Sequence, residues 1–184
     1  DVREAIKRGY PAGHVLSSTI IDEEDDDDLR LAFDFDGVLA DDESETVMHN
    51  TNDLKQFHNH ETKNILQPHT PGPLKEFLVK ISAIQLREEN KKKIDTQYKN
   101  RLRVSIVTAR NAPSHERALN TLKKWGVMAN DAFFLGGVDK GLVLGVLKPH
   151  IFFDDQSGHL NSTSKVAPSV HIPFGIKNIV EATE

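Results

Sequence analysis

The 184-residue sequence contains no cysteine, which excludes disulfide bonds and thiolate metal sites and fits a reducing compartment such as the cytoplasm. It also lacks an apolar run of the roughly 20 residues that span a bilayer, and its opening residues do not form a secretory signal. The net charge of −5 argues against a nucleic-acid-binding protein, which needs a basic face to neutralise phosphates. We therefore expect a cytoplasmic protein without membrane or nucleic-acid partners, in which a local pocket can still attract small anions.

The sequence begins with Asp1 in place of methionine, and we interpret it as a fragment of a longer protein. Residues 1–28 predict a short helix, an apolar stretch and then seven consecutive acids that begin at Asp22. Such a run repels itself and is typical of a solvated linker, and nothing in it fixes the geometry of a calcium site. This region is predicted to be an N-terminal remnant followed by an acidic linker.

Strands and helices alternate along the rest of the chain. Apolar segments of strand length occur at 29–35, 103–107, 132–135, 150–153 and 169–172, with helical patterns at 114–125 and 140–147. This alternation implies crossover connections, and hence an α/β fold with a mostly parallel sheet flanked by helices. Ligands of such sheets bind at the carboxyl ends of the strands. The polar residues that follow the strands are therefore candidates for a functional site.

Two acidic pairs follow predicted strands. Residues i and i+2 of a strand point to the same side, so Asp34 and Asp36 would lie close together at a strand end. A cation relieves such a pair, and Mg²⁺ prefers oxygen ligands. One carboxylate could attack phosphorus while the other handles the proton of the leaving group. Asp154 and Asp155 would share that cation if the two strands are neighbours, although a turn or a helix cap explains each pair as well.

Two further clusters suggest phosphate binding. Thr108, Ala109 and Arg110 follow a strand and precede a helix, where a hydroxyl and backbone N–H groups form a natural phosphate cradle. Arg110 could bind phosphate bidentately or lie on the surface, and Thr108 could simply cap the helix. Lys140 opens a helix, where its charge could neutralise a transferring phosphoryl group or remain exposed to solvent.

The order of the clusters carries more weight than any one of them. It runs D-x-D-G-V, T-A-R, D-K-G and D-D. This order resembles the four motifs of the haloacid-dehalogenase-type phosphohydrolase superfamily, which here cover residues 29–172. A closer resemblance is to the cytosolic 5′-nucleotidase family, which hydrolyses nucleoside monophosphates, and it rests on FDFDGVLADDESE, VTARNAPSHERALNTLKKWGV, DAFFLGG and LKPHIFFDDQSGHL. Members of that family carry a considerable N-terminal region, and DVREAIKRGYPAGHVL at the start of this sequence resembles the tail of that region.

The resemblance implies roles for the acidic pairs. Asp34 would be the nucleophile and a Mg²⁺ ligand. Asp36 would be the general acid and base, and its backbone carbonyl would also bind the metal. Asp154 would complete the metal site, with Asp155 beside it.

The resemblance also implies that Thr108 and Lys140 hold the phosphoryl oxygens. It predicts a catalytic core with a haloacid-dehalogenase-like Rossmannoid sheet, made of residues 29–39 and 102–184. Residues 40–101 would be a helical cap insertion that contacts the leaving group.

The predicted cap contains several side chains of interest. Within it, a helix that begins near residue 74 is predicted to bury one apolar face, made of Leu74, Phe77, Leu78, Ile81 and Ile84. The two-residue spacing of His58 and His60 would suit zinc ligands on a strand, where i and i+2 share a face. Because this segment has a helical pattern instead, both histidines are predicted to face solvent. Phe57 could stack on a nucleobase.

The function expected from the resemblance is Mg²⁺-dependent hydrolysis of nucleoside 5′-monophosphates through an aspartyl-phosphate intermediate. One alternative is a phosphatase for another small phosphate ester, because one fold hosts many specificities. A second is a truncated, non-catalytic module that binds nucleotide or Mg²⁺. The preferred base and sugar, allosteric nucleotides, a homo-oligomeric state and the need for the N-terminal region stay open.

Overall fold

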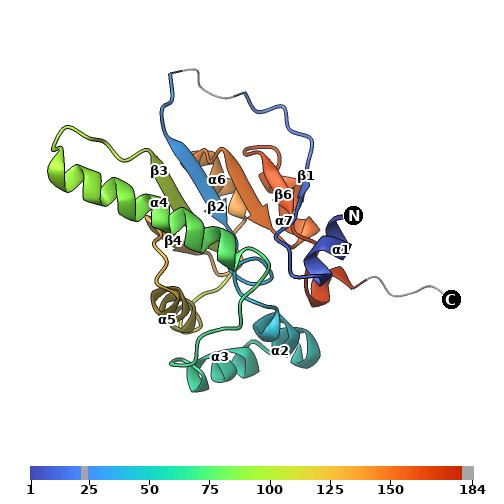
Figure 1. The fold of residues 1–184 in the computed structure, drawn as a ribbon. Coiled ribbons are helices and arrows are strands. Elements are labelled where there is room, and N and C mark those ends of the chain that lie inside the picture. The colour runs from blue at the N-terminus through green and yellow to red at the C-terminus, as the bar shows by residue number, and fades with distance from the viewer. Residues whose placement is uncertain (22–24, 180–184) are drawn as a thin grey trace.

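A computed structural model describes residues 1–21 and 25–179 of the chain, and it has the expected α/β architecture (Figure 1). Asp22–Glu24 of the predicted linker lie outside the described residues. In sequence order the strands are β1 (His14–Val15), β2 (Leu29–Phe33), β3 (Leu102–Thr108), β4 (Asp131–Phe134), β5 (Ile151–Asp154) and β6 (Ser169–His171). The helices are α1 (Val2–Lys7), α2 (Glu43–Thr51), α3 (Leu54–Lys63), α4 (Lys75–Ile94), α5 (His115–Trp125), α6 (Lys140–Leu147), α7 (Ser157–Thr163) and the 3₁₀ turn η1 (Ile176–Asn178).

The strands form one sheet in the order β1-β6-β5-β2-β3-β4. Every pair is parallel except β1 with β6, which confirms the predicted mostly parallel sheet. The strand β2 lies between β3 and β5, so the first and second acidic pairs leave neighbouring strands. The antiparallel strand β1 means that part of the predicted N-terminal remnant belongs to the sheet.

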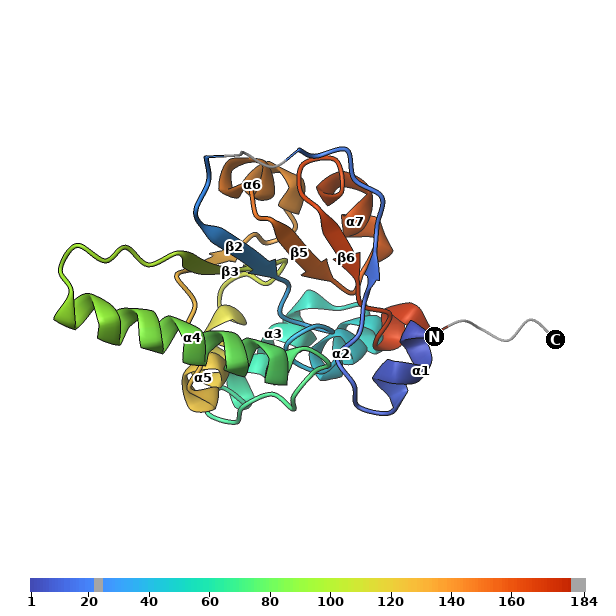
Figure 2. The ribbon, with the colours of Figure 1, turned by 45° about the horizontal axis from the view of Figure 1, so that its top comes forward.

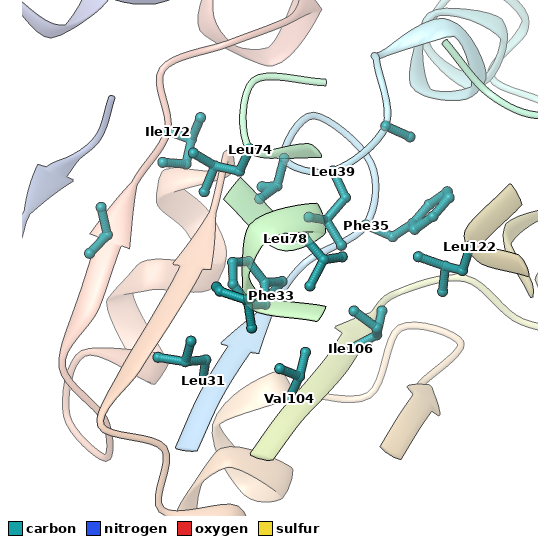
Figure 3. Close-up of a cluster of buried hydrophobic side chains, with 14 of the residues drawn as sticks. Leu31, Phe33, Phe35, Leu39, Leu74, Leu78, Val104, Ile106, Leu122 and Ile172 are labelled. Atoms are coloured by element: carbon teal, nitrogen blue, oxygen red, sulfur yellow. The ribbon is translucent and has the colours of Figure 1, made fainter. Parts of the chain in front are cut away.

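Helices cover both faces of the sheet (Figure 2). Leu31 and Phe33 of β2 belong to the apolar cluster on the face covered by α4 and α5, and Figure 3 shows Phe33 next to Leu78 of α4, with Leu122 of α5 farther along the cluster near Ile106. Ala32 points to the opposite face, where the second apolar cluster includes a leucine of α6. Burial on both faces explains why the sequence of β2 is nearly continuous in apolar residues.

The buried face of α4 differs in part from the prediction. The buried apolar residues are Leu74, Leu78 and Ile81. Phe77 and Ile84 remain exposed over 37% and 49% of their surfaces. In the later turns Ser82 and Gln85 are buried instead, because they bond to the segment between α5 and β4: Ser82 Oγ accepts from the Met128 N–H at 2.9 Å, and Gln85 Nε2 donates to Asn130 at 2.9 Å.

The predicted cap insertion contains two kinds of structure. The helices α2 and α3 pack on each other and lie near the carboxyl ends of the central strands (Figures 1 and 2). The helix α4 instead forms part of the layer that covers the sheet. The boundaries 40–101 therefore stay a prediction, and only α2 and α3 lie where a cap would lie. No helix in the described ranges has the length and apolar character needed to cross a membrane.

Candidate active site

The chain leaves the central strand β2 through a short loop that carries both aspartates of the first pair. Asp34 and Asp36 are both buried, and the Phe35 N–H donates to Asp34 Oδ1 at 2.7 Å. Gly37 follows with φ of +70°, a conformation that favours glycine. A Cβ at this position would lie 2.5 Å from Asp155 Cγ. Glycine is therefore required both by the turn and by the close approach of the second acidic pair.

Lys140 connects the two acidic pairs. Its Nζ lies 2.6 Å from Asp34 Oδ2 and 2.8 Å from Asp154 Oδ2, and all three side chains are buried. The lysine occupies the first position of α6, which Asp139 caps by accepting from the Gly141 N–H at 2.7 Å. Burial by itself lowers the pKa of Lys140, but attraction to the two carboxylates outweighs burial, so its pKa lies above the ordinary value. The ammonium group is charged at neutral pH.

The acidic residues around Lys140 are not fully neutralised by it. Burial, opposed by Lys140, raises the pKa of Asp34 to about 6. Burial and the neighbouring carboxylates Asp34, Glu45 and Asp154 raise the pKa of Asp155 to about 10. Within the described residues, neither carboxylate oxygen of Asp155 and only one oxygen of Glu45 has a hydrogen-bond partner. Buried oxygens without partners are costly, so this cluster has an excess of negative charge and of oxygen acceptors.

A divalent cation fits that excess. Hard cations such as Mg²⁺ take oxygen ligands, and the carboxylates of this cluster offer several of them. Asp34 and Asp154, with His159, bring ligand atoms within 4.8 Å of one another. His159 Nδ1 also lies 3.2 Å from Asp154 Oδ2. Asp34, Asp154 and Asp155, together with the backbone carbonyl of Asp36, would hold the cation, and these metal roles stay predictions.

We expect Asp155→Asn to abolish stabilisation by Mg²⁺ without destabilising the metal-free protein. The pKa of about 10 means that Asp155 is protonated in the metal-free protein at neutral pH, and asparagine is a neutral group of the same shape. A cation that binds only the folded state raises the melting temperature. At a concentration of 100 times its Kd it adds about 2.7 kcal/mol to the free energy of unfolding. Thermal unfolding with increasing Mg²⁺ measures this, with Asp131→Asn as an acid-to-amide control outside the cluster. An equal Mg²⁺ shift in wild type and Asp155→Asn would contradict the metal assignment.

The predicted phosphate-binding residues lie at the end of β3, beside β2. Thr108 is buried at the last position of the strand, and its Oγ1 accepts from the Arg110 N–H at 3.3 Å. Ala109 is exposed. Both residues line the same pocket as Asp34 and Asp36. Their backbone and hydroxyl groups are thus close to the first acidic pair, and phosphate binding by them stays a prediction.

The guanidinium of Arg110 is not free to bind a phosphate group with two N–H donors, the role that its position in the sequence suggested. Its guanidinium is buried and bonds bidentately to Asp36, with Nε–Oδ2 and Nη2–Oδ1 both at 2.7 Å. Its other N–H groups donate to Glu61 and to the Ser114 carbonyl and Ser44 hydroxyl oxygens. Direct phosphate binding by Arg110 stays a prediction that these contacts do not favour.

One pocket of about 340 Å³ joins these residues to α2 and α3. Asp34, Asp36 and Thr108 line it at the strand ends, and Met48, Leu54 and Phe57 give it an apolar wall. The buried Asp34 carboxylate, paired with the ammonium group of Lys140, thus lies beside a space that can hold an organic group. Such a site can transfer a phosphoryl group to a carboxylate.

The prediction that the two histidines of α3 face solvent is wrong, because each makes a side-chain contact within the protein and is only partly exposed. Both are half-buried. His58 Nε2 lies 2.9 Å from Asn111 Oδ1, and His60 Nε2 lies 2.8 Å from Glu43 Oε1. These contacts join α3 to the loop that contains Asn111 and to α2, so the two histidines have a structural role.

Sequence reasoning missed several residues of the site. Glu45 and His159 lie within the quoted family stretches, and their proximity to the aspartates was the available signal. Glu61 gave no signal, because a single charged residue in a helical segment usually faces solvent, and His69 lies in the proline-rich segment 67–73, where no sequence pattern indicates burial. In the structure both are fully buried beside Arg110.

Comparison with known proteins agrees with this geometry. The family model described as 5′-nucleotidase matches residues 1–179. The human protein cytosolic 5′-nucleotidase 1B is 36% identical over 181 residues, which cover 96% of this chain and 28% of that protein. The chain thus spans little more than a quarter of the length of this relative, and no solved structure matches it. The predicted resemblance is confirmed, and the chain belongs to the 5′-nucleotidase family.

Proposed function

We propose that this chain hydrolyses nucleoside 5′-monophosphates to nucleoside and phosphate, with Mg²⁺ as its cofactor. The observation that carries the proposal is the position of Asp34. It is buried at the exit of the central strand, 2.6 Å from the ammonium group of Lys140, and it lines the pocket between the strand ends and α2–α3. Membership of the 5′-nucleotidase family and the name of the human relative support the substrate class.

The reaction begins with attack of an Asp34 carboxylate oxygen on phosphorus. The bond from phosphorus to the 5′-oxygen breaks, and that oxygen takes a proton from Asp36 as the nucleoside leaves. Water then attacks the phosphorus of the aspartyl phosphate, gives its proton to Asp36, and releases phosphate and free Asp34. Lys140 and Thr108 hold the phosphoryl oxygens, and the fixed charge of Lys140 favours the developing negative charge. When bound, Mg²⁺ supplies further neutralisation of the phosphate charge.

The apolar wall of the pocket supports a nucleoside as the leaving group. Met48, Leu54 and Phe57 come from α2 and α3, and Phe57 is half-buried. A nucleobase stacks well on an aromatic ring, whereas a small polar ester leaves such a wall without a partner. We place this reaction in the cytoplasm, as the name of the cytosolic relative suggests.

A substrate panel tests the leaving group. We expect kcat/KM for nucleoside monophosphates to be at least about tenfold higher than for glycerol phosphate or sugar phosphates. Phe57→Ala should remove most of this difference by raising KM for the nucleotides. The measurement is kcat/KM for phosphate release across the panel, with Leu66→Ala as an exposed apolar control outside the pocket. Equal efficiency for all esters would favour a phosphatase of another small phosphate ester.

A non-catalytic binding module makes a different prediction. Such a module would bind nucleotide and Mg²⁺ with no phosphate release from any member of the panel. Folded protein that shows this result would exclude the proposed activity for this chain.

A further inference from the structure

Among the described residues, Arg110 is the side chain that holds Asp36, the carboxylate assigned to proton transfer. Two parallel bonds of 2.7 Å join the guanidinium to both oxygens of Asp36. Such a bidentate pair fixes the plane of a carboxylate as well as its position. Each oxygen keeps a second lone pair, so Asp36 can still exchange a proton on the side of the pocket, which it lines.

Arg110 is in turn held from the other side by α3. Its Nη1 pairs with Glu61 Oε2 and donates to the Ser114 carbonyl at 3.0 Å. Glu61 is itself fixed, because its Oε1 accepts from Arg117 at 2.9 Å and from the Ser44 hydroxyl at 2.8 Å. A guanidinium with partners on every nitrogen has one orientation.

The positive charges within this cluster already have partners without a substrate. Arg110 and Arg117 pair with the buried carboxylates of Asp36 and Glu61, and Arg117 also pairs with the partly exposed Glu43. A phosphate group that bound Arg110 directly would have to displace Asp36 or Glu61 and leave a buried carboxylate without its partner, which is strongly unfavourable. The contacts of Arg110 are therefore those of a group that acts on Asp36.

We propose that Arg110 is the positioning residue for Asp36, and that Glu61 of α3 locks it in place. This inference rests on the proposed phosphatase function, in which the carboxyl group of Asp36 must be correctly oriented to protonate the leaving oxygen. Through Glu61, the helices beside the pocket are coupled to the group that protonates the leaving oxygen. Arg110 affects the reaction only through the orientation of that group.

The test compares two arginines that share Glu61. Arg110→Lys keeps the positive charge but loses the fork, and Arg117→Lys makes the same change at a residue that does not contact Asp36. Each protein is assayed with a nucleoside monophosphate, whose alkoxide leaving group needs a proton, and with p-nitrophenyl phosphate, whose phenolate leaves without one. We expect Arg110→Lys to lower kcat about 100-fold for the nucleotide and less than about tenfold for the phenyl ester. Arg117→Lys should change the ratio of the two rates far less than Arg110→Lys does, because Arg117 does not contact Asp36.

A second variant guards against misfolding of Arg110→Lys. Glu61→Gln keeps the shape of the side chain but weakens the lock on Arg110, and it should show the same selective loss at smaller amplitude. Equal losses for both substrates in Arg110→Lys and Glu61→Gln would overturn the positioning role while the phosphatase function stands. Wild-type protein that hydrolyses neither substrate would overturn the proposed function and this inference with it.

Discussion

Asp34→Asn is expected to abolish phosphate release while the protein remains folded. Removal of a covalent nucleophile costs about 10⁴-fold or more in kcat, because the remaining groups only orient the substrate. Asparagine keeps the shape of the side chain and an oxygen that can accept from the Phe35 N–H. It also removes one acid from a cluster in which burial raises the pKa of Asp34 to about 6. The lost ion pair with Lys140 is therefore offset by reduced repulsion, and we expect the melting temperature to change by only a few degrees.

Phosphate release and thermal unfolding of the same preparation measure both parts of this prediction. Asp131→Asn is the control, since it makes the same chemical change at a partly exposed acid paired with Arg103. Near-full activity in Asp34→Asn would show that water attacks the phosphate directly or that another residue is the nucleophile.

Glu61→Ala should produce the largest loss of stability among single substitutions in the helices beside the site. Glu61 is fully buried and pairs with both Arg110 and Arg117, so alanine leaves two buried guanidinium groups without a common partner. Removal of one member of a buried ion pair costs about 3–5 kcal/mol. Glu43 is the matched control, because it also pairs with Arg117 but its side chain is 37% exposed. Glu43→Ala should cost less than about 1 kcal/mol.

The stability lost in Glu61→Ala should depend on pH. Burial alone would raise the pKa of Glu61, but the bonds and charges of His69 and Arg110 outweigh it, so the pKa lies below the ordinary glutamate value. A lowered pKa stabilises the folded protein above the unfolded-state pKa, and that stabilisation is lost as the pH falls toward the folded-state pKa. Urea unfolding should therefore give the full difference in the free energy of unfolding between wild type and Glu61→Ala at pH 7. This difference should become smaller below about pH 4. A small difference at pH 7 would mean that the cluster contributes no stability.

The sequence predicts the sheet well, because its signal is local. The apolar run of β2, buried on both faces, and the helix from Lys140 to Leu147 follow from periodicity alone. The short helix α7 was not predicted, since SGHLNST has no apolar period and depends on its packing beside β5 and β6. The face of α4 was predicted only in its first turns, because Ser82 and Gln85 are buried by bonds to a distant loop.

The site was predictable only where residues follow strands. Asp34, Thr108 and Asp154 meet because parallel neighbouring strands end at the same edge of the sheet. The partner of Arg110 could not be predicted in this way. An arginine after a phosphate-cradle threonine suggests a phosphate ligand, and the carboxylates that it binds come from another loop and from α3. Long-range pairing of this kind leaves no period or spacing in a single sequence.

The decisive measurement is phosphate release from a nucleoside monophosphate by wild type and by Asp34→Asn, each assayed with Mg²⁺ and with EDTA. We expect wild-type release that requires Mg²⁺ and no release by the variant. Release that persists in EDTA, or that Asp34→Asn retains, would contradict a metal-dependent phosphatase with Asp34 as its nucleophile.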